Sequence, residues 1–404
     1  MSKKLVITCL INFLIAALMG LVLRYSFIEA IPINYRYLIH AHSHVAMLGW
    51  VYLMLCVLIV HYFVLEKKPI YNRLFWVTQT TVVGMMLSFP FQGYAAVSIS
   101  FSTLHIFCSY YFAFLIWKQH KTTSIVTSYL LKASLLFMLL STLGVWCLGP
   151  AVSMLGQASA FYQIAIQLFL HFQFNGWFLI AVIGVFFHIL KLKDSKQFRL
   201  FFKLLIVSTI LTMALPVYWF APHQSLLWMN GLGVLIQLFL LILFLKLIMP
   251  YQFQLLQQNT KLIIYVFSFS VFCFVLKIVL QSFSLIPEIA AVAYQHRNLV
   301  IGFIHLLMIG VITGFLFGFI LQGKLVTFNL GLRLGIFTFI LGFVLTECLL
   351  IIQGGMFYFA KGIIPNYYLL LFIFSTLLPL GIAFIIFNLL KQKTHGHQKT
   401  PKTT

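Results

Sequence analysis

The chain has 404 residues, of which 62% are hydrophobic and only 8% are charged, with 26 Lys and Arg against 5 Asp and Glu. Soluble domains carry about a quarter of charged residues, so this composition excludes a soluble globular protein, a disordered chain and a fibrous repeat. The net charge of +21 does not indicate a nucleic-acid binder, because the basic residues are scattered between long apolar runs and form no single basic face. The sequence therefore predicts an integral membrane protein that is embedded in the lipid bilayer.

Twelve apolar segments are long enough to cross a bilayer as helices, which requires about 20 residues each. Their apolar runs are continuous and not alternating, which is typical of helices and not of membrane strands. In chain order the predicted spans are 5–23, 37–65, 74–92, 97–117, 124–148, 159–190, 200–219, 225–248, 262–282, 297–322, 328–352 and 363–390. The predicted fold class is all-α, a polytopic helical bundle that forms one transmembrane domain over 1–390, followed by a short polar cytoplasmic tail at 391–404.

The basic residues of the connections predict the orientation, because Lys and Arg are retained on the cytoplasmic side. If the N-terminus is cytoplasmic, 18 of them lie inside: Lys3, Lys4, Lys67, Lys68, Arg73, Lys118, Lys121, Lys191, Lys193, Lys196, Arg199, Lys246, Lys261, Lys324, Lys391, Lys393, Lys399 and Lys402. Four lie outside: Arg24, Arg36, Arg297 and Lys361. The other four fall within spans, mostly near an end from which the charge could reach water: Lys132, Lys203, Lys277 and Arg333. We therefore expect both termini in the cytoplasm.

The N-terminal segment also has some features of a signal peptide, since Lys3 and Lys4 precede an apolar run. The run is long, however, and no clear cleavage site with small residues follows it. We therefore expect an uncleaved first span.

Several histidines fall at one predicted depth of the membrane. Counting 1.5 Å per residue along the even-numbered helices puts His44, His105 and His305 roughly 10–12 Å from the outer surface and His171 roughly 16 Å from it. Glu347 belongs to the same layer, and His223 lies at the outer mouth. An isolated buried histidine is often bonded only to a backbone carbonyl, but independent structural histidines have no reason to share a layer, so we expect a common site.

The sixth span carries a polar stripe on an otherwise apolar helix. Gln163, Gln167, His171 and Asn175 recur every four residues and so lie on one face. Amides that face lipid would lack hydrogen-bond partners. We therefore expect these side chains, together with Glu347, to line a polar cavity.

The second span begins with three histidines in five residues. His40 and His44 share a face, while His42 points roughly the opposite way. Gly49, and Gly310 after His305, would let a large flat group approach the backbone. Imidazole is a common ligand of haem iron and also suits copper, whereas a site for a hard cation would need several carboxylates.

These features resemble subunit I of the haem–copper oxidase superfamily, which includes the nitric oxide reductases. The segment 41–48 is similar to the part of helix 2 that supplies a low-spin haem ligand there, and 297–305 is similar to helix 10, with His305 at the second His of the family's HxH pair. The spacing from His42 and His44 to Gly49 also resembles the shorter NnrS family. The resemblance implies a bis-histidine haem held by His305 and by either His42 or His44.

The chain departs from the superfamily at its catalytic centre. Phe303 replaces the first His of the HxH pair, and the seventh span lacks the tandem histidines that bind copper. We therefore expect an oxidoreductase-like protein without full oxygen-reducing activity, and an altered second site for a metal, copper being a candidate, or for haem at His171 and His105 with His223. The resemblance further implies a bacterial cytoplasmic membrane, respiratory-chain subunits or a cytochrome electron donor as partners, and a role in electron transfer or in oxygen or nitric oxide chemistry.

Two other functions are consistent with the same segments. A transporter or channel would use the His- and Gln-lined outer cavity for a small polar solute or a transition metal, although we find no repeat between the two halves and no paired helix breaks at the midplane. A structural assembly subunit would explain the apolar helices but not the layer of histidines.

Overall fold

The computed structural model describes residues 1–66, 68–122, 124–252, 256, 257, 259–323 and 325–391; the predicted tail from 392 onward lies outside this range. Within it, twelve helices are long and apolar enough to span a membrane, as predicted. Their bounds are Lys3–Tyr25, Tyr35–Phe63, Pro69–Gln92, Ala96–Gln119, Ile125–Leu155, Ala160–Ile189, Lys196–Tyr218, Gln224–Tyr251, Lys261–Leu285, Arg297–Gln322, Leu330–Tyr358 and Tyr367–Lys391. All regular structure in the described residues is helical. The chain is therefore an all-α integral membrane protein.

Six spans are single helices: α1 (Lys3–Tyr25), α4 (Pro69–Gln92), α5 (Ala96–Gln119), α6 (Ile125–Leu155), α17 (Leu330–Tyr358) and α18 (Tyr367–Lys391). Three others continue into a short turn or second helix: α9 (Lys196–Leu211) with α10 (Ala214–Tyr218), α11 (Gln224–Ile248) with η3 (Met249–Tyr251), and α13 (Lys261–Ser282) with η4 (Phe283–Leu285). The short α14 (Pro287–Val292) and η5 (Ala293–Gln295) precede the tenth span.

The second, sixth and tenth spans each contain a π-helical segment between two α-helices. They are α2 (Tyr35–His44), η1 (Val45–Tyr52) and α3 (Leu53–Phe63); α7 (Ala160–His171), η2 (Phe172–Phe178) and α8 (Leu179–Ile189); and α15 (Arg297–His305), η6 (Leu306–Thr313) and α16 (Gly314–Gln322). Asn34 and Ser159 begin α2 and α7 by accepting a hydrogen bond from the backbone N–H three residues on, which satisfies a donor that the helix leaves unpaired.

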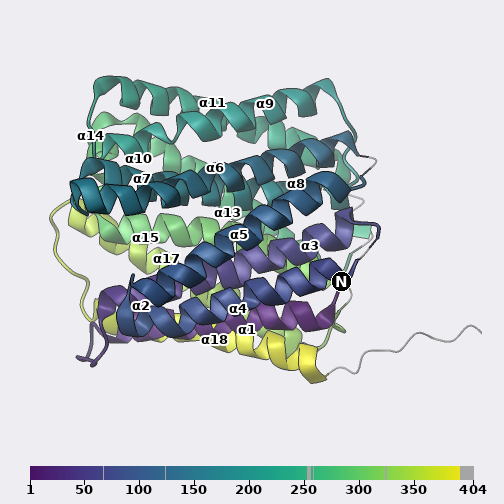
Figure 1. Cartoon of the computed structure of the whole chain (residues 1–404), viewed down its shortest axis with the longest axis horizontal. Coiled ribbons are helices and arrows are strands. Elements are labelled where there is room, and N and C mark those ends of the chain that lie inside the picture. The colour runs from purple at the N-terminus through teal and green to yellow at the C-terminus, as the bar shows by residue number, and fades with distance from the viewer. Residues whose placement is uncertain (67, 123, 253–255, 258, 324, 392–404) are drawn as a thin grey trace, which may run out of the picture.

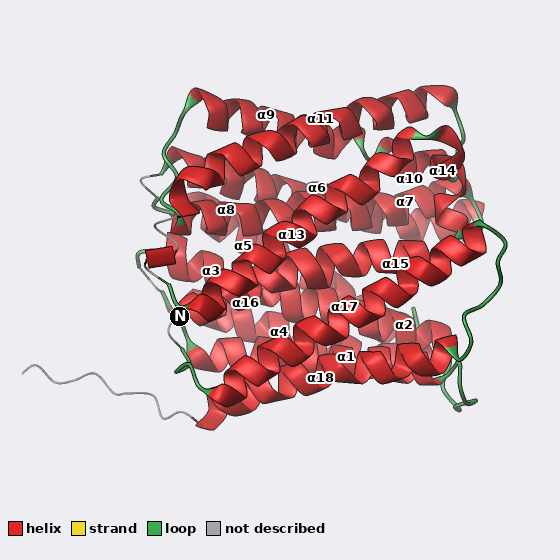
Figure 2. Ribbon diagram, turned by 180° about the vertical axis from the view of Figure 1, so that it is seen from behind, coloured by secondary structure: helices red, strands yellow, loops and turns green. Residues whose placement is uncertain are grey.

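These three spans form the centre of the bundle. In their most apolar 18-residue windows 78%, 78% and 61% of the residues are buried, against 33–50% in the other nine. The N-terminus and the end of α18 lie at the same end of the bundle (Figures 1 and 2). We call the half of the bundle farther from the N-terminus the distal half; it contains α2, α7 and α15.

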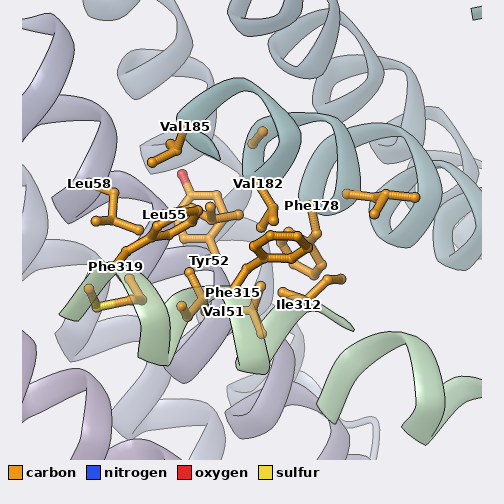
Figure 3. Close-up of a cluster of buried hydrophobic side chains, with 14 of the residues drawn as sticks. Val51, Tyr52, Leu55, Leu58, Phe178, Val182, Val185, Ile312, Phe315 and Phe319 are labelled. Atoms are coloured by element: carbon orange, nitrogen blue, oxygen red, sulfur yellow. The ribbon is translucent and has the colours of Figure 1, made fainter. Parts of the chain in front are cut away.

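The half nearer the N-terminus has a continuous apolar core. Figure 3 shows Leu55 and Leu58 from α3, Val182 and Val185 from α8, and Phe315 and Phe319 from α16 packed together in this core. Every residue of α8 from Leu179 to Phe187 is buried, as is every residue of α16 from Gly314 to Leu321. The three central helices are therefore held together by apolar contacts on this side.

The last two spans pack at the closest distance that backbones allow. A Cβ added at Gly381 would lie 2.7 Å from the carbonyl oxygen of Gly335, and one at Gly335 would lie 3.1 Å from that of Gly381. Small residues of this kind let membrane helices approach each other, where apolar burial against lipid contributes little.

Gly381→Leu is expected to destabilise the protein by about 1–3 kcal/mol, because the new side chain must push α17 and α18 apart. The matched control is Gly355→Ala, also in α17, where an added Cβ meets nothing within 4 Å. The measurement is the midpoint of thermal unfolding in detergent. Equal midpoints for the two variants would contradict this account of the packing.

Candidate functional site

A histidine immediately precedes each of the three π-helical segments. His44 precedes η1, His171 precedes η2 and His305 precedes η6, and in each case a glycine follows five residues later: Gly49, Gly176 and Gly310. The His-x4-Gly pattern therefore recurs at intervals of four spans, a threefold repeat that a comparison of the two halves misses. Single π turns occur mostly at functional sites, so the repeat directs attention to the three histidines.

The distal halves of the central helices are less tightly packed than their other halves. Only Leu38 and Ala41 are buried in α2, Ala165 in α7 and Gly302 in α15. The side chains of the distal half of the three central helices are therefore more accessible than those of the other half.

Helix α1 positions His42. The Nδ1 atom of His42 lies 2.8 Å from the carbonyl oxygen of Ala16, and a Cβ added at Gly20 would lie 2.9 Å from the imidazole Cε1. A carbonyl only accepts, so Nδ1 carries the proton and Nε2 holds a free lone pair. Gly20 makes space for the ring one turn after Ala16, and Nε2 is thereby oriented as a ligand.

His305 lies on α15, within electrostatic range of His42. The Nδ1 atom of His305 lies 3.6 Å from Oε1 of Glu347 on α17. A carboxylate beside Nδ1 is the partner that orients a metal-binding histidine and leaves Nε2 as the ligand. His42 and His305 therefore each have another group on the Nδ1 side, and we call these two histidines the facing pair.

Glu347 is a buried carboxylate without a conventional partner. Its residue exposure is 6%, and neither oxygen has a hydrogen-bond partner among the described residues. A Cβ added at Gly302 would lie 3.3 Å from Oε2, so the glycine lets the carboxylate lie against α15 one turn before His305. An isolated buried carboxylate is costly, and a positive charge nearby reduces that cost.

That charge is supplied by arginines at the distal end. Arg24 interacts electrostatically with Glu347, His305 and His42. Arg297 contacts Tyr35, its guanidinium carbon 5.5 Å from the ring centroid, and Arg36 is near His40. Arg24 is therefore the basic residue that acts on the facing pair, whereas Arg36 lies on the face of α2 that carries His40 and His44.

His44 belongs to a different group, between α2, α4 and α5. Its Nδ1 lies 2.8 Å from the carbonyl oxygen of His40, and its Nε2 lies 3.4 Å from the hydroxyl of Tyr94. Its ring packs on Phe89 with centroids 4.4 Å apart. Both nitrogens of His44 are therefore engaged, on the face of α2 opposite to that of His42.

His105 lies near His44 and has one unpaired nitrogen. Its ring contacts Tyr52 with centroids 4.7 Å apart, Nδ1 is 3.4 Å from the Ser109 hydroxyl, and Nε2 is buried without a hydrogen-bond partner. The rings of His105 and His44 interact electrostatically.

The side chains of His171 and His223 make hydrogen bonds with other parts of the chain. Nε2 of His171 lies 2.8 Å from the carbonyl oxygen of Thr209 on α9, and Nδ1 of His223 accepts a hydrogen bond from the backbone N–H of Ser225 at the start of α11. No group of three or more His, Cys, Asp or Glu side chains in the described part of the chain is placed to hold a metal ion. His171, His105 and His223 therefore do not converge on one metal, and any role as separate ligands stays a prediction.

The polar stripe of the sixth span is half-buried along its whole length. Gln163 donates to the carbonyl oxygen of Gln157 at 2.9 Å, and Asn175 donates to that of His171 at 3.3 Å. Asn175 is the one residue of η2 that is not fully buried, and its Oδ1 has no hydrogen-bond partner. Together with Gln167, these side chains lie toward the less tightly packed half of the bundle.

Lys277 is a functional candidate that the sequence did not single out among the four basic residues expected within spans. It is only 2% exposed, donates to Gln281 at 2.7 Å and lies 5.8 Å from the ring centroid of Phe303. It also interacts electrostatically with His171. A lysine within the apolar run 262–280, four residues before a glutamine, is the signal that could have identified it.

The role predicted for Gly49 and Gly310 is also wrong. A Cβ at Gly49 would lie 2.8 Å from Val82, and one at Gly310 would lie 2.8 Å from Phe343 and 2.9 Å from Cys273. The space beside each glycine is filled by neighbouring helices, so these residues permit helix packing and not the approach of a flat group.

The donors present fit a haem better than a bare metal ion. Two imidazoles whose Nδ1 sides are each occupied could supply the two ligands of a haem iron, and an arginine such as Arg24 suits a haem carboxylate. A protein-bound zinc or copper ion usually takes three or four side-chain ligands, which the described residues do not bring together here. No protein-family model matches this chain, and no curated protein sequence matches it significantly.

Proposed function

We propose that this membrane protein binds one low-spin haem between α2 and α15, with His42 and His305 as axial ligands. The observation that carries the proposal is the facing pair, in which Ala16 and Glu347 each occupy the Nδ1 side of one imidazole. A group that contacts the second ring nitrogen of a metal-binding histidine fixes the tautomer and the ring orientation that metal coordination requires. The choice of His42 over His44 follows from the contacts of His44 with Tyr94 and His40.

The arginines favour one direction for the insertion of the haem. Arg24 and Arg297 lie at the distal end, where carboxylates on a haem edge could meet them. Arg binds carboxylates through paired, charge-assisted hydrogen bonds. This arrangement supports insertion with the propionate edge toward the distal face and the apolar edge toward the core.

The activity we propose is electron transfer. A haem iron with two histidine ligands changes between the ferric and ferrous states and carries one electron. With both axial positions held by the protein, neither oxygen nor nitric oxide can bind unless an imidazole leaves, so turnover of either gas is the less favoured form of the proposal. Copper remains a secondary candidate at the other histidines.

We further infer that the protein lies in a bacterial cytoplasmic membrane with its N-terminus in the cytoplasm, because 18 basic residues fall on that side and 4 on the other. The facing pair is then in the outer half of the membrane. A cytochrome or another respiratory subunit on the outer face is the partner class that could exchange electrons with it.

The dithionite-reduced minus oxidised spectrum of protein purified from haem-replete cells tests the proposal. We expect a sharp α band and a shifted Soret band, and we expect His61→Ala and His188→Ala to leave both unchanged, since these residues lie in the half nearer the N-terminus. A colourless protein would contradict the haem and favour the alternative of a transporter or channel for a small polar solute or a transition metal.

A further inference from the structure

A cavity opens at the end of the bundle that carries the N-terminus, well away from the facing pair (Figure 1). It has a volume of about 260 Å³ and is bounded by α1, η1, α3, α4 and α5. At its mouth Ser2, Lys68 and Asn72 are exposed, whereas Leu53 and Thr78 at its far end are buried. The cavity is therefore a blind pocket that is entered from this end of the bundle.

The pocket has the depth and the walls to hold part of a hydrocarbon chain. Its lining on α4 runs from Pro69 to Thr78, nine residues or about 13 Å along a helix axis. The apolar side chains that form most of its walls include Leu5, Val57, Val60, Leu74, Phe75 and Phe112. An apolar cavity stays dry, and its walls lack the contacts that a filled interior gains. An acyl chain from the surrounding bilayer would supply those contacts.

Lysines lie at the mouth of the pocket. Lys68 lines the cavity and is exposed immediately before α4. The Nζ atom of Lys4 on α1 lies 5.0 Å from the ring centroid of Trp76, which is one turn after Asn72 on the same face of α4. Within the described part of the chain, no Asp or Glu lines this cavity. The mouth is therefore positively charged and complements an anionic group.

The mouth also lies at the depth where a lipid headgroup is found. Helices α1 and α4 both begin there, so the apolar spans end at this level. Tryptophan is enriched where membrane helices meet the headgroup region, and Trp76 lies in the first two turns of α4 beside Lys4. A charged headgroup at the mouth and a chain in the pocket would thus each meet a matching surface.

We propose that this cavity binds one anionic phospholipid, with an acyl chain in the apolar pocket and the headgroup phosphate between Lys4 and Lys68. Basic pockets between membrane helices bind anionic headgroups in this way. A zwitterionic phospholipid carries the same phosphate, but its own ammonium group cancels the charge. The proposal does not depend on the haem.

The test is native mass spectrometry of the full-length protein in detergent, stripped of co-purified lipid and titrated with phosphatidylglycerol. Phosphatidylcholine with the same acyl chains is the control ligand, and the readout is the apparent Kd of the first bound lipid. We expect phosphatidylglycerol to bind at least about tenfold more tightly, since each of two lysines near an anionic headgroup contributes roughly a factor of five. An excess of glycerol 1-phosphate, the anionic group without acyl chains, should not displace the lipid.

Matched variants locate the two parts of the site. Lys68→Ala should lower the affinity for phosphatidylglycerol roughly fivefold, whereas Lys203→Ala, which removes an exposed lysine of α9, should leave it unchanged. Val60→Trp should lower the affinity for both lipids at least about tenfold by filling the pocket. Val77→Trp, at an exposed position of α4, should not. Size-exclusion chromatography checks the folding of each variant.

Equal affinities for the two lipids, or displacement by glycerol 1-phosphate, would overturn the proposal. Both of these measurements use the wild-type chain, so they decide the matter even if a variant fails to fold. The same loss of affinity in Lys68→Ala and Lys203→Ala would show that the headgroup does not lie at the mouth. Unchanged binding in a folded Val60→Trp protein would show that the acyl chain lies outside the pocket.

Discussion

His42→Ala is expected to reduce the haem content per polypeptide by at least about tenfold, whereas His44→Ala retains the haem and its reduced spectrum. Replacing a residue that is hydrogen-bonded to a metal ligand usually lowers the affinity for the metal 10- to 100-fold. Losing the ligand itself should lower the affinity for haem by more than this. The Nδ1 atom of His42 is bonded to Ala16 and no described residue occupies its Nε2, whereas both nitrogens of His44 are engaged by His40 and Tyr94.

The measurement is the ratio of haem, as its pyridine haemochrome, to protein in the purified variants. His305→Ala should match His42→Ala, because the two residues act as one pair. Each variant must first give a symmetric size-exclusion peak, so that loss of haem is distinguished from loss of fold. If His44→Ala loses the haem and His42→Ala keeps it, the assignment of the axial ligand is wrong.

Glu347→Gln is expected to raise the midpoint potential of the haem by roughly 60–120 mV. A residue behind a metal ligand changes metal affinity by about 10- to 100-fold, and each tenfold preference between two redox states corresponds to about 59 mV for one electron. The sign is positive because the carboxylate, 3.6 Å from Nδ1 of His305, stabilises the more positive ferric state, and the amide does not.

Potentiometric titration followed at the α band measures this shift. Glu288→Gln is the matched control, since Glu288 is an exposed carboxylate of α14 at the same end of the molecule. We expect its potential to equal that of the wild type. A lowered potential in Glu347→Gln, or the same shift in both variants, would show that Glu347 does not act through His305.

The fold was largely predictable from hydropathy, because each membrane-spanning helix must be apolar over about 20 residues and must satisfy its own backbone. The predicted 37–65 is Tyr35–Phe63 in the structure, and the predicted 297–322 is unchanged. The eleventh helix continues to Tyr358, six residues beyond its predicted end, since nothing in Gln353-Gly354-Gly355 breaks it. The π-helical segments were not predicted, because hydropathy carries no information on hydrogen-bond register.

The candidate site was predictable only in part. Depth along a helix follows from residue counting, which predicts one layer for His44, His105, His305 and His171. Counting does not give the rotation of a helix about its axis relative to its neighbours. Periodicity shows that His42 and His44 lie on different faces, but only packing against α1, α4 and α15 shows which face meets His305.

The sequence by itself determined that this is a twelve-span membrane protein, and its basic residues predict which side each connection occupies, because the costs of burying apolar and charged groups depend on composition and not on neighbours. Tertiary structure decided which side chains meet. Glu347 lies beside His305, Lys277 is buried against Phe303, and Arg24 interacts with both His42 and Glu347. These contacts join helices far apart in the chain, and they arise from the packing of glycines and aromatic rings between helices, which no single helix encodes.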